Sequence, residues 1–230
     1  MGSALVEAVQ LIFSGDHILL QIIGTTLRMT LLSSLIALVI GVPIGVWLGT
    51  SVFRGRKILV IIDRAFMGMP PVVCGLFCYL LFSGVGPLRG LHLLYTVPGM
   101  VIAQIMLLLP QSVGMLESYT NGIAPQIRET TRGLGISRSG MILLTINESR
   151  YHVISTWLFL LGRAMAEVGA VAIVGGAIMF KTNVMTTAIM NYTSMGSFTT
   201  AMALGIILLL IALILNIIVA LIQKGTENKR

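Results

Sequence analysis

Long apolar runs alternate with short polar segments along this chain of 230 residues. Five of the runs approach the roughly 20 apolar residues that cross the hydrocarbon core of a bilayer. They are Leu31–Leu48, Val72–Phe82 with its upstream extension, Val101–Met115, Val153–Met179 and Ala201–Ile222. The pattern predicts an all-α polytopic membrane protein with five transmembrane helices, within residues 16–223. Residues 1–15 are expected to form an amphipathic segment at the outer interface, and residues 224–230 a charged tail.

One polar segment, residues 125–135, is too long to be a simple turn between two spans. It carries charge in a helical pattern, and we expect a helix to begin at its first residue, a proline. Glu129 then lies near the positive end of the helix dipole, and Gly133 and Gly135 offer a left-handed stop. The surrounding loop, about residues 119–140, is therefore predicted to place a helix outside the bilayer, where another protein can push on it.

Prolines interrupt the first three predicted spans. The first span, about Ile18–Thr50, contains Pro43, which is expected to bend it. In the second, the adjacent Pro70 and Pro71 remove two backbone donors at membrane depth, and the freed carbonyls must face protein or a wet cavity. These two prolines mark either a static kink or a kink beside a permeation path or gate. Pro110 is expected to break the third span.

The fourth predicted span carries two charges at membrane depth. Arg163 and Glu167 are four residues apart, hence on one helix face and able to pair. Charged groups in a bilayer face a cavity or each other, so the pair either only packs the bundle or lies on a translocation path. A stretch rich in threonine and asparagine follows this span and includes Thr186, Thr187 and Asn191. We expect it to be an outer loop with a partial helix dipping toward the midplane.

The net charge of +7 comes from basic residues at the ends of the spans, not from a soluble basic face. Nucleic acid is therefore not an expected partner. By the positive-inside rule, the side with most arginines and lysines is cytoplasmic. That side holds 11 of the 15 basic residues, which are Arg54, Arg56, Lys57, Arg64, Arg128, Arg132, Arg138, Arg150, Lys224, Lys229 and Arg230. This bias predicts an amino terminus outside, with the carboxyl terminus and the polar segment in the cytoplasm.

The motifs of common catalytic and metal sites are missing from the sequence. There is no P-loop, no His-Glu-x-x-His and no Gly-x-Ser-x-Gly. Cys74 and Cys78 lie four residues apart within a span, a spacing that suits neither a disulfide nor a zinc site and favours apolar packing. We therefore expect no catalytic residue, no metal site and no enzyme activity in this chain.

The polar segment also carries a motif. It reads Glu129-Thr130-Thr131, then Arg132-Gly133-Leu134, then Gly135. This resembles the EAA loop of ABC importer permeases, in which Glu-Ala-Ala is followed by three residues and a glycine. In that family the loop is the coupling helix that docks into a groove of a cytoplasmic ATPase subunit. The resemblance implies the type I ABC importer permease fold and a coupling role for seven residues: Arg128, Glu129, Thr130, Thr131, Arg132, Gly133 and Gly135.

Other stretches resemble oxyanion permeases, and the tungstate branch in particular. They include Phe66–Val73, Gly162–Ala170, Val174–Gly176 and Val184–Ile189, and the resemblance covers about residues 20–222. It implies a homodimer, two cytoplasmic ATP-binding subunits and an external substrate-binding protein. ATP and Mg would be bound by the partner subunit, so that no cofactor is expected in this chain.

The resemblance implies that the chain is a permease subunit that forms the translocation path for tungstate in the cell (cytoplasmic or inner) membrane. Thr186, Thr187 and Asn191 are candidate neutral donors to the oxyanion, and Arg163 offers a positive field partly cancelled by Glu167. One alternative is a permease for molybdate, sulfate or another oxyanion. Another is a secondary transporter independent of any ATPase, which would not need the coupling loop.

Overall fold

The computed structural model describes residues 17–227 together with Val6 and Gln10. Within them the chain is helical and contains no strand. The helices are α2 (His17–Thr50), α3 (Arg56–Met67), α4 (Pro71–Phe82), the short 3-10 helix η1 (Arg89–Leu91), α5 (Val97–Gly133), α6 (Arg138–Glu148), α7 (Arg150–Met165), α8 (Gly169–Gly175), α9 (Met185–Ser194) and α10 (Phe198–Glu227). The expected amino-terminal segment 1–15 and residues 228–230 of the expected tail lie outside this range, except Val6 and Gln10. Residues 224–227 continue α10.

Three helices are long and apolar enough to cross a membrane, namely α2, α5 and the part of α10 up to Ile218. Two further pairs pass the same test only when taken together. The α3–α4 pair is bent by 98° and the α7–α8 pair by 58°. Counting each bent pair as one span gives five. The predicted all-α polytopic fold is confirmed for the described residues, and the five predicted spans are matched when each bent pair counts as one.

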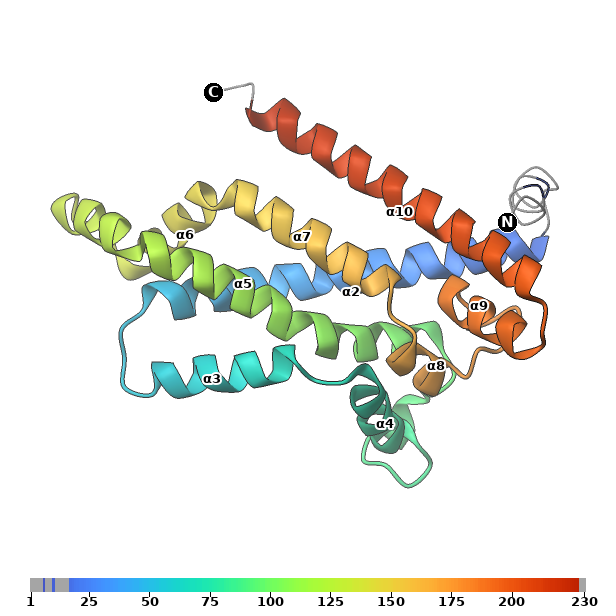
Figure 1. Ribbon diagram of the computed structural model, residues 1–230. Coiled ribbons are helices and arrows are strands. Elements are labelled where there is room, and N and C mark those ends of the chain that lie inside the picture. The colour runs from blue at the N-terminus through green and yellow to red at the C-terminus, as the bar shows by residue number, and fades with distance from the viewer. Residues whose placement is uncertain (1–5, 7–9, 11–16, 228–230) are drawn as a thin grey trace.

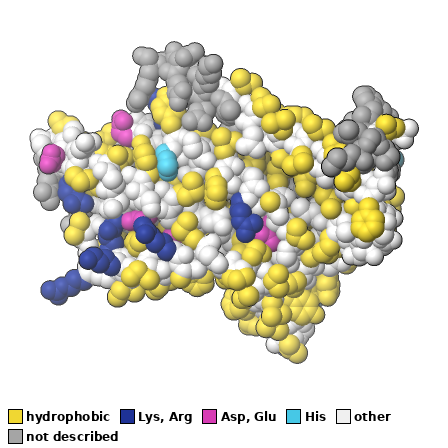
Figure 2. Space-filling model, in the orientation of Figure 1, with side chains coloured by type: hydrophobic (Ala, Val, Ile, Leu, Met, Phe, Trp, Pro, Cys, Tyr) yellow, Lys and Arg dark blue, Asp and Glu magenta, His cyan; other side chains and the backbone are white. Residues whose placement is uncertain are grey.

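The helices define two ends of the molecule. In Figure 1, α2, α5 and α10 run in one direction, while α3 and α7 run back beside them. We call the end where α5 meets α6 the α6 end, and the opposite end, with α9 and the loop before α5, the α9 end. The Lys and Arg side chains in view gather mainly at the α6 end, while apolar side chains cover much of the remaining surface (Figure 2). This segregation of charge matches the pattern in the sequence.

The longest helix, α5, corrects two expectations. It runs unbroken for 37 residues and contains both Pro110 and Pro125. The expectation that Pro110 breaks the third span is therefore wrong, and so is the expectation of a separate helix starting at Pro125. A proline removes one backbone hydrogen bond, but Leu107, Leu108 and Gln111 on either side of Pro110 are buried. Packing around the proline outweighs the lost bond, so the polar segment forms the last turns of α5.

The α2 helix, also continuous through Pro43, packs along α5 through a seam of glycines. Gly41, Gly45 and Gly49 are four residues apart and face α5. A Cβ atom placed on Gly45 would lie 2.6 Å from the Val113 carbonyl oxygen and 2.7 Å from Leu116 Cβ. Small residues at such spacing let two membrane helices approach backbone to backbone. The seam makes α2 and α5 the central pair of the bundle.

We predict that Gly45→Ala destabilises the protein, because the new methyl group meets the α5 backbone. Overpacking of this kind costs typically about 1–3 kcal/mol. Gly24→Ala, in the same helix, is the matched control, since nothing lies within 4 Å of a Cβ atom there. Its thermal unfolding midpoint in detergent should equal or exceed that of the wild type, while Gly45→Ala lowers it. Equal unfolding midpoints for the two variants would contradict the close packing of α2 against α5 at Gly45.

Candidate functional site

The chain reverses at the junction of α5 and α6, residues 126–140, which we call the corner. Gly135 has a φ of +64°, in the left-handed region that favours glycine. The N–H of Ile136 donates to the Thr131 carbonyl at 3.0 Å and closes the end of α5. Ser137 then caps α6 by accepting a hydrogen bond from the Gly140 N–H at 3.2 Å. The predicted stop lies at Gly135.

The seven residues with an implied coupling role divide into two groups. Glu129 and Thr130 are exposed, as are Gly133 and Gly135. Arg128 instead turns toward the bundle, and Thr131 is buried, with its hydroxyl donating to the Arg128 carbonyl at 3.2 Å. The first group is therefore available to a partner, and the second attaches the corner to the rest of the protein. The side chain of Arg132 lies outside the described part of the chain.

The seven residues with an implied coupling role do not include the most prominent apolar side chain of the corner. Leu134 is 68% exposed at the very tip of the reversal. Its neighbours Gly133 and Gly135 carry no side chain that would cover it. A leucine between two glycines in a polar segment was the available sequence signal. Leu134, together with the less exposed Ile136, adds apolar contact points to a largely polar surface.

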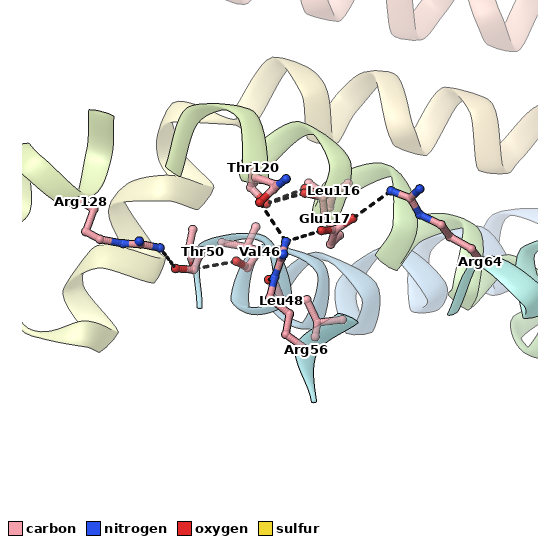
Figure 3. Close-up of polar contacts among 10 residues, drawn as sticks. Val46, Leu48, Thr50, Arg56, Arg64, Leu116, Glu117, Thr120 and Arg128 are labelled. Carbon is pink, nitrogen blue, oxygen red and sulfur yellow. Dashed lines mark hydrogen bonds and ion pairs between the residues drawn. The ribbon is translucent and has the colours of Figure 1, made fainter. Parts of the chain in front are cut away.

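Arginines hold the α6 end of the bundle together (Figure 3). The last carbonyls of α2 have no partner within their own helix. Arg56, the first residue of α3, donates through Nε to the Leu48 carbonyl at 2.6 Å, and Arg128 donates through Nη2 to the Thr50 carbonyl at 2.7 Å. Cations at a helix carboxyl terminus also oppose the negative end of its dipole. Arg56 and Arg128 thereby join α3 and the corner to α2.

Arg56 also contacts a buried carboxylate, which was not identified from the sequence. Glu117 of α5 is only 4% exposed, and its Oε1 accepts a hydrogen bond from Arg56 Nη2 at 2.5 Å. Arg56 Nη2 also donates to Asn121 Oδ1 at 2.9 Å. Arg64 Nη2 lies 3.7 Å from Glu117 Oε2 and is itself largely exposed. The signal in the sequence was an acidic residue at the end of an apolar run.

A cavity of about 480 Å³ lies beneath the corner. Its lining includes Trp47 and Phe53, whose rings stack with centroids 5.1 Å apart, and Ile136 and Met141 from the corner and α6. Arg128 also borders the cavity. The corner is therefore not packed flush against the end of α2, and the hydrogen bond from Arg128 bridges part of the gap.

The first broken span bends at the two prolines, as expected for a kink. Pro70 precedes α4 in an extended conformation, and Pro71 is the first residue of that helix. Neither can donate a backbone hydrogen bond. The Phe66 carbonyl, which the missing N–H of Pro70 would otherwise satisfy, accepts from the Met69 N–H at 3.0 Å, and the Pro70 carbonyl starts α4 by accepting from the N–H groups of Val73 and Cys74. The backbone at the 98° bend is thus hydrogen-bonded within the protein.

The second break lies at the ion pair of the fourth span. The expected pairing is present, with Arg163 Nη1 3.1 Å from Glu167 Oε2. Glu167 Oε1 accepts the N–H of Ala170 at 3.2 Å, so the carboxylate also binds the start of α8. The span predicted within 153–179 is present but interrupted, because α7 ends at Met165 and α8 begins at Gly169. The Glu167 side chain supplies an acceptor that a continuous helix would have supplied from its backbone.

The two breaks are in contact through α4 and α8. A Cβ atom on Gly75 of α4 would lie 2.7 Å from Ala170 Cα, and one on Gly169 would lie 2.9 Å from Val72 Cγ2. From the other side, Gln104 of α5 donates to the carbonyl of Ala164 at 2.8 Å. The bent segments of the second and fourth spans therefore form one buried unit beside α5.

The three candidate donors to an anion lie on or near α9, the partial helix expected in this region. Thr186 donates to the Glu167 carbonyl at 2.9 Å, which places it at the second break. The Thr187 hydroxyl accepts from the Val184 N–H at 3.0 Å and donates to Asn183 Oδ1 at 2.9 Å. Both threonines are buried, and Asn191 is half-buried. Each threonine hydroxyl therefore has a partner within the protein.

Cys74 and Cys78 are free and buried against α5. Within residues 17–227, Val6 and Gln10, no three His, Cys, Asp or Glu side chains are placed to hold a metal ion. The arrangement offers broken helices, one paired charge at depth and an exposed corner at one end. Broken helices and a paired charge at membrane depth are features of membrane transport proteins.

Comparison with known proteins defines the family. No family model matches the chain. A tungstate uptake system permease protein, TupB, of Peptoclostridium acidaminophilum is 33% identical over 217 residues, covering 94% of this chain and 95% of that protein. TupB of Campylobacter jejuni is 33% identical over 212 residues, covering 92% and 89%. The sulfate transport system permease protein CysW of Escherichia coli is 29% identical, covering 93% and 76%.

A solved structure agrees on the fold. A chain of the crystal structure of a bacterial alginate ABC transporter superposes with a TM-score of 0.73 at 18% identity, covering 94% of this chain and 84% of that chain. The protein has the fold of an ABC transporter permease. It belongs to the family of anion permease subunits of ABC importers that includes the tungstate uptake permeases.

We predict that Glu167→Ala destabilises the protein strongly, because Arg163 loses its partner and the Ala170 N–H its acceptor. Breaking a buried ion pair from one side costs about 3 kcal/mol or more. Glu167→Gln keeps an acceptor for Ala170 and should lie between the wild type and Glu167→Ala in thermal unfolding midpoint. Identical midpoints for the two variants would show that the bond to Ala170 contributes nothing.

Proposed function

We propose that the chain is the membrane subunit of an ATP-driven importer that carries tungstate inward across the cytoplasmic membrane. The observation that carries this proposal is the 33% identity with two tungstate uptake permeases over nearly the whole of each chain. The sulfate permease is less similar and aligns with a smaller part of its length. Tungstate is therefore preferred to sulfate or molybdate as the substrate.

The corner is the proposed docking site for a cytoplasmic ATPase subunit. It projects beyond the apolar bundle and presents Glu129, Thr130 and Leu134 outward. Because α5 continues without a joint from the corner to Val97, a push on the corner is delivered along the full helix. ATP and Mg are bound by the ATPase subunit. This chain binds neither, and its α5 helix transmits the movement of the corner.

The orientation follows from the distribution of charge. The arginine-rich α6 end faces the cytoplasm, which places the amino terminus outside and the carboxyl terminus inside. An external substrate-binding protein then meets the α9 end, where η1 and α9 lie. Two copies of the chain form the complete path, with one ATPase subunit bound to each.

The broken spans are the proposed moving parts of the path. Pro70 and Pro71 lie at one break, and Arg163 and Glu167 lie at the other. A tungstate dianion needs donors and positive potential, but a path must also release it. Pairing with Glu167 weakens the field of Arg163, which is one third exposed, and so favours passage over tight binding. Thr186 and Asn191 lie nearby on α9 as neutral polar groups.

Docking of the ATPase is tested by charge and polarity changes on the corner. We expect Glu129→Lys and Leu134→Asp to leave the amount of permease in the membrane unchanged and to abolish co-purification of the ATPase. Both residues are exposed, so neither change disturbs the core. Arg89→Glu, an exposed change at the α9 end, is the control and should retain the ATPase. Normal recovery with both corner variants would rule out this docking site.

The substrate is tested by uptake into vesicles that contain the complete transporter. We expect ATP-dependent uptake of radioactive tungstate, blocked by a small excess of unlabelled tungstate and only by a large excess of molybdate or sulfate. Uptake that follows an ion gradient without ATP would identify a secondary transporter. Equal competition by sulfate would assign the protein to a broader oxyanion class.

A further inference from the structure

Apolar contacts attach the α3 helix only weakly to the rest of the bundle. None of its 12 residues is buried. Its large apolar side chains are largely exposed. The side chains of Ile58 and Ile61 are each more than half exposed, and that of Phe66 is half exposed. Its contacts run along α5, where Met67 and Asp63 reach Gly114. Apolar burial alone therefore gives little reason for α3 to follow α5 when α5 moves.

Polar contacts supply the missing attachment. Arg56 at the start of α3 joins three groups: the Leu48 carbonyl, Glu117 Oε1 and Asn121 Oδ1. Arg64, further along α3, approaches the other oxygen of the same carboxylate. Figure 3 shows Glu117 between the two arginines. Of the charged groups close to this carboxylate, Asp63 is the one acidic neighbour on α3.

The buried carboxylate fixes geometry more than it adds stability. Replacing a buried ion pair by apolar residues is often neutral for folding, so stability alone does not require Glu117. A short charge-assisted hydrogen bond is directional. Because Arg56 of α3 binds both Glu117 Oε1 and Asn121 Oδ1 of α5, the register of α3 along α5 is set at this point. The backbone carbonyl of Leu48 adds α2 to the same junction.

At the opposite end of the second span, α4 packs mainly on α8, with Gly75 against Ala170, next to the break at Glu167. Its contact with α5 is smaller and runs through Cys74 and Cys78. The second span is thus tied to α5 through Glu117 at the α6 end, and to the fourth span through α4. The flexible point between these two anchors is the bend at Pro70 and Pro71.

We propose that Glu117 is a positioning residue that makes α3 move with α5, so that a displacement of the corner is converted into a change of angle at the Pro70–Pro71 bend. Glu117 contacts neither the ATPase nor the anion in this scheme. It acts through Arg56 on the second span. The inference rests on the proposed function, because it assumes that an ATPase moves the corner.

The direct test measures whether α3 stays in register with α5. Spin labels at Ile61 and Gly122, both exposed, report the distance between these helices in a background without Cys74 and Cys78. Labelled copies are diluted with unlabelled ones, so that only pairs within one chain contribute. We expect one distance in the transporter, unchanged by a non-hydrolysable ATP analogue. In Glu117→Gln the distance should broaden or shift with nucleotide. A nucleotide-dependent distance in the parent, or an unchanged one in Glu117→Gln, would overturn the proposal.

The functional test compares uptake with ATP hydrolysis. Glu117→Gln and Arg56→Gln should assemble with the ATPase and hydrolyse ATP at rates near that of the wild type. Their tungstate uptake per ATP should fall by roughly tenfold, within the usual range of coupling between distant sites. Arg64→Gln is the matched control and should change this ratio little, because Arg64 is 61% exposed and 3.7 Å from the carboxylate.

The possible failures are distinguishable. If uptake and hydrolysis fall in proportion in both variants, Glu117 has a merely structural role and the proposal is wrong. If Arg64→Gln uncouples as strongly as Arg56→Gln, Glu117 does not act specifically through Arg56, and the proposal is wrong. If the unaltered transporter shows no ATP-driven uptake at all, the proposed function fails and not only the role of Glu117.

Discussion

Close approach of two backbones, α2 and α5, is the constraint on which the rest of the bundle depends. Gly41, Gly45 and Gly49 bring the α2 backbone against α5 between Ser112 and Asn121, and side chains of α2 pack against Leu108 and Leu116, on either side of Pro110. That support explains why α5 remains one helix through Pro110, whose missing hydrogen bond would otherwise invite a break. The other spans pack around this pair, and two of them are broken where α5 is not.

Buried polar groups have different kinds of hydrogen-bond partner in the continuous helix α5 and at the two broken spans. In α5, Gln104 accepts a hydrogen bond from Ser33 of α2 at 2.6 Å and donates to Ala164 at the end of α7. At the breaks, the Glu167 side chain accepts the Ala170 N–H, and the Phe66 carbonyl, which Pro70 cannot satisfy, accepts the Met69 N–H. An unsatisfied backbone group in a bilayer is expensive. Broken helices therefore persist here because each has its own set of partners inside the protein.

Much of the architecture was predictable from the sequence, because apolar length is a strong signal. The five runs correspond to the five spans, and the pairing of Arg163 with Glu167 follows from their spacing on a helix. Effects of proline were predicted less well. Pro70 and Pro71 bend their span, whereas Pro110 and Pro125 do not, since packing against neighbours decides the outcome. Local sequence does not contain that information.

The site was predictable only where its residues are adjacent in the chain. The corner, with its stop at Gly135, was visible as a polar segment ending in glycines. Glu117 was not, since its partners Arg56 and Arg64 are some 50–60 positions away and meet it only through the packing of α3 on α5. The break at Glu167 was also hidden, because an acidic residue that caps a new helix looks, in sequence, like one inside a continuous helix.

The unbroken length of α5 has a thermodynamic consequence. A stiff element shared by two distant surfaces makes their equilibria mutually dependent, and such dependence is reciprocal by necessity. If a partner bound at the corner favours one position of α5, then a second partner bound at the α9 end that favours the same position must tighten binding at the corner by the same factor. Occupancy of one end of α5 would then be sensed at the other end through binding affinity alone.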